Sequence, residues 1–268
     1  MISPLASVHP NAKIGSNVTV DPFTMIHDDV VIGDNTWIGS NVTIMSGARI
    51  GSRCRIFPGS VLSAIPQDLK FEGERTTAEI GDGCTVREFV TVNRGTKASG
   101  KTFIGKNCLL MAYAHVAHDC MIGDNVILAN GVNLAGHVEI EDNAILEGIV
   151  AVQQFVRIGE HAFITGGSLV RKNVPPYVKA AREPLSYAGI NSIGLRRRRF
   201  SDETIRNIED TYRILYVREN NVSKALGMIQ REIPATPERD KIIDFIINSP
   251  KGIMKGYGEA ETEEEEIR

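Results

Sequence analysis

A branched aliphatic residue recurs at every sixth position of this chain. The ladder begins at Ile2, runs without exception to Leu62 and, after two interruptions, continues in the same phase to Val170. A second ladder lies two residues before the first and holds only small or β-branched residues, including all four cysteines. A period of six is neither that of a helix nor that of a flat strand. It predicts a coil with three flat sides that closes every eighteen residues, with the aliphatic side chains inside.

Glycine and asparagine recur in one phase between the aliphatic positions, as in Gly15-Ser16-Asn17 and Gly123-Asp124-Asn125. These residues tolerate the left-handed backbone angles that a sharp corner needs. The pattern does not set the handedness of the coil, since parallel crossovers are normally right-handed. The cysteines are expected to be small interior residues rather than redox or metal ligands.

The ladders also predict the domain boundaries. We expect a β-helix at residues 1–190, with projecting loops at 63–79 and 94–103 where the ladder breaks, because binding groups are commonly found on such loops. A small helical domain is expected at 191–257, with Ser201 as the N-cap of one helix, a second helix near 222–232 and a third opened by Thr236-Pro237. Residues 258–268 form an acidic tail that we expect to be solvated and disordered.

Composition excludes several classes of function. The net charge is −3, but the last eleven residues hold six glutamates and one arginine, so the remainder has a net charge of +2. That is not the charge of a nucleic-acid-binding protein. No apolar run approaches the roughly 20 residues that span a bilayer, and the first residues lack the features of a signal peptide. We therefore expect a cytoplasmic protein without stable membrane insertion.

Three of the six histidines fall on neighbouring coils. His118 is predicted to point outward, with Gly136 one coil above it and Gln154 one coil further; His115 and His137 lie close by. Because Asp119 adjoins His118, the pair offers a base and a carboxylate beside a free glycine amide, which is what acyl transfer requires. Zinc is the alternative for three histidines. The spacing used by zinc-binding hexapeptide proteins is absent, so no metal is expected.

Five motifs occur in an order that resembles one family. They are His115-Val116-Ala117-His118-Asp119-Cys120, Gln67-Asp68-Leu69-Lys70, Asn93-Arg94-Gly95-Thr96, Leu134-Ala135-Gly136-His137 and the segment from Asn191 to Arg198. The chain is similar, over nearly its whole length, to the UDP-N-acetylglucosamine O-acyltransferases, which catalyse the first step of lipid A synthesis. The resemblance implies a left-handed parallel β-helix of hexapeptide repeats with a small C-terminal α-helical domain, assembled as a homotrimer.

The resemblance also implies a reaction. An (R)-3-hydroxyacyl chain would pass from acyl carrier protein to the 3-hydroxyl of UDP-N-acetylglucosamine. His118 would be the general base, Asp119 its orienting carboxylate and the Gly136 amide the oxyanion donor. No cofactor is expected beyond the phosphopantetheine that carries the acyl group.

Binding roles follow by position within the resemblance. The residues expected to contact substrate or carrier protein are Asp68, Lys70, His115, His137, Gln154, Gly166, Asn191, Arg197 and Arg198. Asn93, Gln153 and Ile193 depart from the family's usual residues, and these departures fall on the expected uridine and ribose contacts. Gly166 matches a position in the acyl channel, and its missing side chain predicts a donor of about fourteen carbons or more.

Other functions remain open from the sequence. A sibling enzyme of the same pathway N-acylates a glucosamine intermediate, but it normally has an extra N-terminal domain. A more distant relative would use acetyl-coenzyme A. A non-catalytic hexapeptide scaffold is the alternative from a different class, although a scaffold needs neither outward histidines nor projecting loops.

Overall fold

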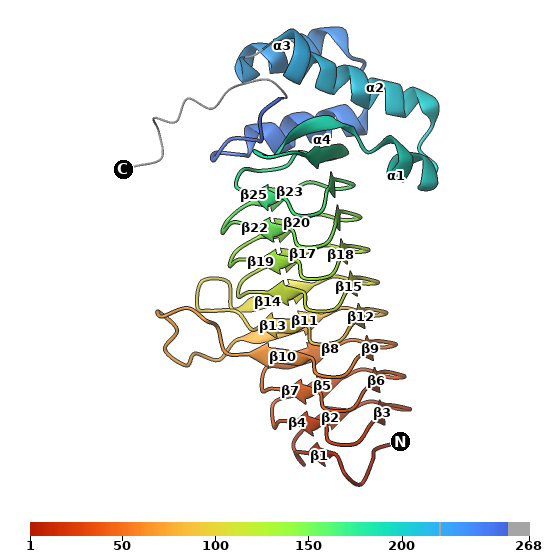
Figure 1. Ribbon diagram of the computed structural model, residues 1–268, viewed down its shortest axis with the longest axis vertical. Coiled ribbons are helices and arrows are strands. Elements are labelled where there is room, and N and C mark those ends of the chain that lie inside the picture. Colours follow the sequence, from red (N-terminus) through yellow and green to blue (C-terminus); the bar gives the residue numbers. More distant parts are fainter. Residues whose placement is uncertain (220, 257–268) are drawn as a thin grey trace.

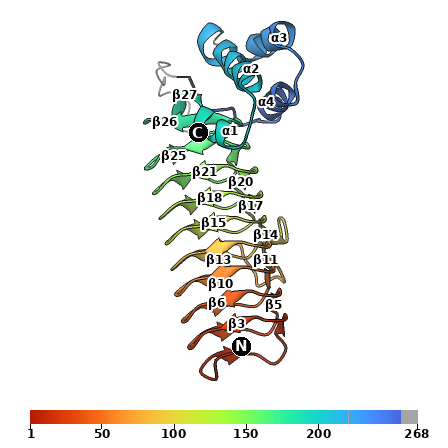
Figure 2. The ribbon, with the colours of Figure 1, turned by 90° about the vertical axis from the view of Figure 1, so that its right-hand side faces the viewer.

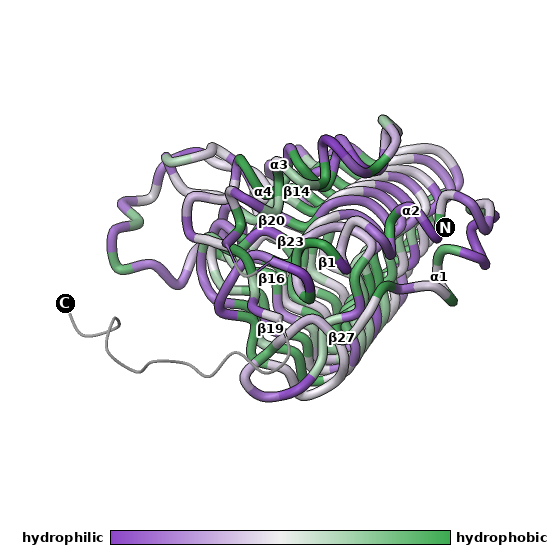
Figure 3. The backbone as a smooth tube through the Cα atoms, turned by 90° about the horizontal axis from the view of Figure 1, so that it is seen from above, coloured by the Kyte–Doolittle hydropathy of each residue, from purple (hydrophilic) through white to green (hydrophobic). Residues whose placement is uncertain are grey.

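The computed structural model describes residues 1–219 and 221–256, so the predicted acidic tail at 258–268 lies outside the described part. The chain winds into a tall prism whose short strands are stacked coil upon coil (Figure 1). In the described part of the chain, three sheets form its sides, and all their strands are parallel except β27 at the upper end. Seen from above, hydrophobic positions recur on the same sides of successive coils (Figure 3).

Within the described residues the first sheet has nine strands, which follow one another from the bottom coil upward. They are β1 (Ser7–Val8), β4 (Met25–Ile26), β7 (Thr43–Ile44), β10 (Val61–Ala64), β13 (Thr91–Asn93), β16 (His115–Val116), β19 (Asn133–Leu134), β22 (Ala151–Val152) and β25 (Leu169–Val170).

The second and third sheets continue around the prism. The second contains β2 (Lys13–Ile14), β5 (Val31–Ile32), β8 (Ala48–Ile50), β11 (Thr77–Ile80), β14 (Lys101–Ile104), β17 (Met121–Ile122), β20 (Glu139–Ile140) and β23 (Arg157–Ile158). The third contains β3 (Thr19–Val20), β6 (Trp37–Ile38), β9 (Arg55–Ile56), β12 (Thr85–Val86), β15 (Leu109–Leu110), β18 (Ile127–Leu128), β21 (Ile145–Leu146), β24 (Phe163–Ile164), β26 (Val178–Ala181) and β27 (Ser186–Ile190).

Strand register confirms the eighteen-residue coil. His115 pairs with Asn133, and Asn133 pairs with Ala151, so both of these steps are eighteen residues. The steps that contain a projecting loop are longer, as between Val61 and Thr91. The aliphatic ladder fills the interior and is almost fully buried from Val20 onward. Ile2 is 47% exposed because no coil lies beneath it. The cysteines are buried and form no disulfide, as predicted for interior residues.

Two projecting loops interrupt the prism. The first leaves after β10 and returns at β11, and the second leaves after β13 and returns at β14. Pairing therefore extends into the segments 63–79 and 94–103 where the ladder breaks. Ala64 pairs with Asn93, and Thr77–Glu79 pair with Lys101–Phe103. In Figure 1 the first loop projects to one side of the prism.

Helices cover the upper end (Figure 2). They are α1 (Ser192–Arg197), α2 (Asp202–Arg213), a π-helical segment (Ile214–Arg218), α3 (Val222–Glu232) and α4 (Pro237–Ile247). Ser201 and Thr236 cap α2 and α4 through their side-chain oxygens, as the sequence indicated. The antiparallel hairpin of β26 and β27 and the short helix α1 were not predicted, because the ladder ends before them.

One corner of the prism is closed by aspartates. It lies between the second and third sheets, and we call it the aspartate-capped corner. The backbone N–H of Lys106 donates to Asp124 one coil above, and that of Asp124 donates to Asp142, both at 2.7 Å. Asn107 and Asn125 adopt the left-handed conformation there, with φ of 55° and 57°. Each carboxylate thus satisfies a donor that the turn leaves without a partner.

Candidate active site

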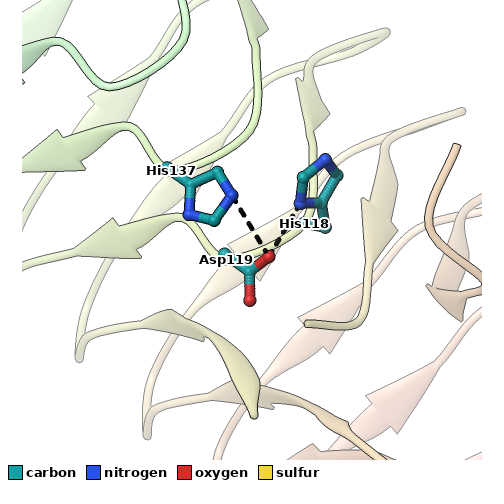
Figure 4. A group of neighbouring side chains, drawn as sticks. All are labelled: His118, Asp119 and His137. Atoms are coloured by element: carbon teal, nitrogen blue, oxygen red, sulfur yellow. Dashed lines mark hydrogen bonds and ion pairs between the residues drawn. The ribbon is translucent and has the colours of Figure 1, made fainter. Parts of the chain in front are cut away.

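The histidine cluster lies on a different corner, between the first and second sheets, which we call the histidine corner. His118 follows β16, and its Nδ1 lies 2.8 Å from Oδ2 of Asp119 (Figure 4). The His118 side chain is outside the hydrophobic core of the prism, yet only 10% of it is exposed. Outward direction at this corner therefore does not mean solvent exposure, because neighbouring residues surround the ring.

Asp119 is held by the second loop. Its carboxylate accepts hydrogen bonds from the Thr96 backbone N–H at 2.9 Å, from the Thr96 hydroxyl at 2.8 Å and from the Ser99 hydroxyl. Burial alone opposes ionisation, but the hydrogen bonds from Ser99, His118 and Thr96 outweigh it and hold the pKa of Asp119 at about 2. A permanently ionised Asp119 favours the His118 tautomer with its proton on Nδ1, which leaves Nε2 as the basic atom.

Gly136 lies directly against the His118 ring. A Cβ atom at this position would lie 2.6 Å from Cε1 and 2.7 Å from Nε2 of His118, so any side chain would displace the imidazole. The carbonyl of His118 accepts from the His137 N–H at 3.0 Å, which fixes the two coils in register. The Gly136 N–H has no hydrogen-bond acceptor among residues 1–219 and 221–256.

His137 completes the cluster. Its Nε2 lies 3.6 Å from Oδ2 of Asp119, and its ring meets that of His118 edge-on at 5.2 Å (Figure 4). Phe155, one coil above, stacks on the His137 ring with centroids 4.5 Å apart. His137 and Phe155 both have φ near 60°, an unusual conformation for such residues.

The side chains of His118, Asp119 and His137 are also close enough together to hold a metal ion. Ligand atoms of His118, Asp119 and His137 lie within 4.8 Å of one another. The Asp119 carboxylate, however, already accepts four hydrogen bonds, which use the lone pairs that a cation would need. A metal would have to displace Thr96 or Ser99. The donor set therefore fits an orienting carboxylate better than a zinc ligand.

The structure brings only some of the other predicted residues near this cluster. His115 lies on β16, with Nδ1 2.7 Å from the Thr91 hydroxyl, and burial lowers its pKa. Gln154 is exposed above Gly136, as the eighteen-residue step predicts. Asp68 and Lys70 lie in the first loop, where the Asp68 carboxylate accepts the Lys70 backbone N–H at 3.0 Å.

Asn191 and Arg197 lie away from the histidine corner. Together with Ile193 they line a cavity of about 460 Å³ beside β21, β24 and α1, on the third sheet. Asn191 also caps α1. Within one chain this cavity and the histidine corner are on different sides of the prism, so the predicted site residues form two separate groups.

Arg198 and Gly166 have other contacts. The Arg198 Nε donates to the Asn143 side chain at 3.1 Å, so this arginine ties the helical cap to the prism instead of lining the cavity. The Gly166 N–H donates to Glu147 at 3.1 Å. A Cβ at Gly166 would lie 3.1 Å from the Gly148 carbonyl oxygen, so only a small displacement of the neighbouring coil would admit a side chain.

Sequence reasoning missed the groups that hold Asp119. Thr96 and Ser99 lie in a loop outside the six-residue register, so stacking arithmetic gives them no position. Phe155 could have been found, since it is eighteen residues after His137.

Comparison with known proteins agrees with this architecture. A family model described as UDP N-acetylglucosamine O-acyltransferase, domain 2, matches residues 173–254, and a model for bacterial transferase hexapeptide repeats matches residues 29–64 and 101–136. An acyl-[acyl-carrier-protein]–UDP-N-acetylglucosamine O-acyltransferase of Chlorobaculum parvum is 56% identical, covering 92% of this chain and 97% of its own length. An enzyme of the same name from Sulfurihydrogenibium is 55% identical, over 94% and 93%.

Solved structures give the same result. The UDP-N-acetylglucosamine acyltransferase of Bacteroides fragilis superposes with a TM-score of 0.94 at 53% identity, covering 95% of this chain and all of that one. The enzyme of Francisella novicida gives 0.93 at 40% identity, over 96% and 95%. These matches confirm the left-handed hexapeptide β-helix with a helical cap. The chain belongs to the UDP-N-acetylglucosamine O-acyltransferase family.

Proposed function

We propose that this protein transfers an (R)-3-hydroxyacyl chain from acyl carrier protein to the 3-hydroxyl of UDP-N-acetylglucosamine, the first step of lipid A biosynthesis. The relatives' names support the two substrates. The observation that carries the mechanism is the His118–Asp119 pair, whose 2.8 Å contact leaves Nε2 of His118 beside Gly136.

In this mechanism Nε2 of His118 removes the proton from the sugar hydroxyl as its oxygen attacks the thioester carbonyl. The oxyanion that forms accepts the N–H of Gly136. When the tetrahedral intermediate collapses, the C–S bond breaks and the thiolate of phosphopantetheine leaves with the proton from His118. Asp119 stays ionised and keeps the imidazole in one orientation. No cofactor takes part, and the acyl group arrives on its carrier.

The split between the two groups of site residues supports a homotrimer. In a trimer, the Asn191–Arg197 cavity of one subunit would face the histidine corner of the next. A second observation also favours an interface. Large hydrophobic side chains are exposed in left-handed conformations along the corner between the third and first sheets, at Phe23, Phe89 and Ile149. Light scattering should give three times the mass of the chain, and a monomer would contradict the proposal.

The direct test is incubation of the purified protein with UDP-N-acetylglucosamine and a series of (R)-3-hydroxyacyl carrier proteins, with the product identified by mass spectrometry. The expected product is the 3-O-acylated sugar nucleotide, with preference for donors of about fourteen carbons or more because Gly166 leaves the channel open. Preference for ten carbons would contradict the assignment to Gly166. Equal activity with acyl-coenzyme A would contradict the carrier protein as donor.

The same assay separates the alternatives. Acylation of a glucosamine amine would indicate the sibling N-acyltransferase. Absence of any transfer, with zinc found in the purified protein, would indicate a metal site. No helix in the described ranges is long and apolar enough to cross a membrane. The cytoplasmic location stays a prediction.

A further inference from the structure

The histidine corner continues upward beyond the candidate base. Because Val152 of β22 pairs with Val170 of β25, Lys172 lies one coil above Gln154. The column of corner residues from His118 therefore ends, two coils above Gly136, in a cation. The described part of the chain contains no carboxylate in an ion pair with Lys172.

A second lysine comes to the same place from the far end of the sequence. The segment after α4 returns to the prism, where Ile253 bridges Asn173 and the Met254 N–H donates to the Asn173 carbonyl at 2.9 Å. Arg157 holds the start of this segment by donating to the Asn248 carbonyl, also at 2.9 Å. These contacts fix the position of the turn that carries Lys251.

Lys251 extends over the aromatic stack of the site. Its Nζ lies 4.6 Å from the centre of the Phe155 ring, and Phe155 stacks on His137. Phe155 is two coils above Asp119, and coils are spaced by roughly 4.8 Å, so the Phe155 backbone lies about 10 Å above that of Asp119. The ammonium group lies against the ring at the upper end of this interval. Substrate bound at His118 and extending up the corner past Gln154 would reach this group.

The charges of the side chains around Lys251 indicate what kind of ligand it could bind. No carboxylate forms an ion pair with Lys251 within residues 1–219 and 221–256, and the Asp119 carboxylate below is saturated by its four donors. Nearby Arg171, by contrast, is paired with Glu183 at 3.3 Å. Within the described residues, the top of the histidine corner thus carries two positive charges that no carboxylate pairs with. A lysine ammonium binds phosphate as a compact point charge.

We propose that Lys251, together with Lys172, binds the phosphate ester of the substrate whose reacting end is held at His118. This inference rests on the proposed function. Both proposed substrates carry such a group: the diphosphate of the sugar nucleotide and the phosphodiester of the phosphopantetheine arm. Lys251 is thereby a binding residue contributed by the helical cap to the site on the prism.

The test compares variants that separate charge from packing. Lys251→Met keeps a flexible apolar stem over Phe155 but removes the charge, and Lys251→Arg restores the charge. Lys172→Met tests the second cation. Lys224→Met, on the exposed face of α3, is the matched control for loss of one positive charge. The KM for each substrate is measured with the other saturating, and binding of UDP and of uridine is measured by calorimetry.

The expected result for Lys251→Met is a rise of about tenfold in the KM for one substrate, with kcat changed less than about twofold, as for loss of one charged hydrogen bond. Lys251→Arg should recover most of the loss, and Lys224→Met should show none. Weaker binding of UDP but not of uridine would assign the diphosphate as the ligand. A raised KM for the acyl donor alone, with UDP binding intact, would assign the phosphopantetheine phosphodiester.

Unchanged KM values for both substrates in the double variant Lys172→Met/Lys251→Met would overturn the inference, leaving Lys251 as a residue that only packs on Phe155. That result is distinct from failure of the proposed mechanism. Full activity of the His118→Ala variant would show that His118 is not the general base, whether or not the lysine variants weaken binding.

Discussion

The aspartate-capped corner and the histidine corner turn the same backbone with different side chains. At the first, asparagines such as Asn107 and Asn125 occupy the left-handed positions, and Asp124 and Asp142 satisfy backbone donors of the coil below. At the second, Asp119, His137 and Phe155 occupy the equivalent conformation. The Gly136 N–H there has no acceptor within the described ranges.

The histidine corner has features that lower its local stability relative to the aspartate-capped corner. A left-handed residue other than glycine, asparagine or aspartate costs roughly 1–2 kcal/mol, which applies here to His137 and Phe155, and a donor without an acceptor adds to that cost. At the histidine corner these costs are offset by the hydrogen bonds of Thr96 and Ser99 to Asp119 and by the stacking of Phe155 on His137. Strained residues and unsatisfied groups that persist in this way tend to cluster at functional sites. The comparison therefore yields activity predictions for one corner and stability predictions for the other.

The largest effect is expected from His118→Ala. Loss of the general base should lower kcat by about 10² to 10⁴. The thermal unfolding midpoint should fall much less than kcat, since Thr96 and Ser99 still hold the Asp119 carboxylate when its contact with His118 is lost. Steady-state kinetics gives kcat, and calorimetry on the same preparation gives the unfolding midpoint. A loss of less than tenfold in kcat would exclude His118 as the base.

Asp119→Asn should come next, with a loss of about 10² in kcat because the amide no longer fixes the imidazole tautomer. Its pH dependence is a second test. The pKa of Asp119 in the folded protein is about 2, below its ordinary 3.8, so its stabilisation is fully present above pH 3.8 and is lost as the pH falls toward 2. Acid unfolding of the wild type should be steeper than that of Asp119→Asn in this window. Equal pH dependence of unfolding in the two proteins would show that folding does not stabilise the ionised form of Asp119.

Asn125→Ala tests the aspartate-capped corner. Alanine is disfavoured at a φ of 57°, so the free energy of unfolding should fall by about 1 kcal/mol. Asn125→Gly should show much less loss, because glycine adopts this conformation readily. Both are measured by denaturant unfolding, and kcat should be unchanged in each. A large fall in kcat would mean that the two corners are not independent.

The smallest effect is expected from Asp142→Ala. The Asp124 N–H would lose its acceptor at 2.7 Å, but Asp142 is exposed and water can replace it. We expect a loss of a few tenths to about 1 kcal/mol in unfolding free energy. The measurement is again denaturant unfolding with parallel kinetics, and a destabilisation above about 2 kcal/mol would mean that the cap has a larger structural role than one exposed hydrogen bond.

Much of this fold was accessible from the sequence because the repeat is local. An aliphatic residue at every sixth position specifies inside and outside, and the eighteen-residue coil follows from three sides. The eighteen-residue step also correctly predicted that Gly136 lies above His118. It failed for β26, β27 and α1, which lie beyond the end of the ladder.

The six-residue repeat alone specifies the prism, its stacking register and the pair of coils on which His118 and Gly136 lie. Other contacts became visible only in the folded chain: Thr96 and Ser99 saturate Asp119, Arg198 ties the cap to Asn143, and Lys251 extends over Phe155. Periodicity fixes neighbours separated by a constant number of residues, whereas loops and the returning C-terminal segment reach the corner by paths whose length and direction no repeat specifies.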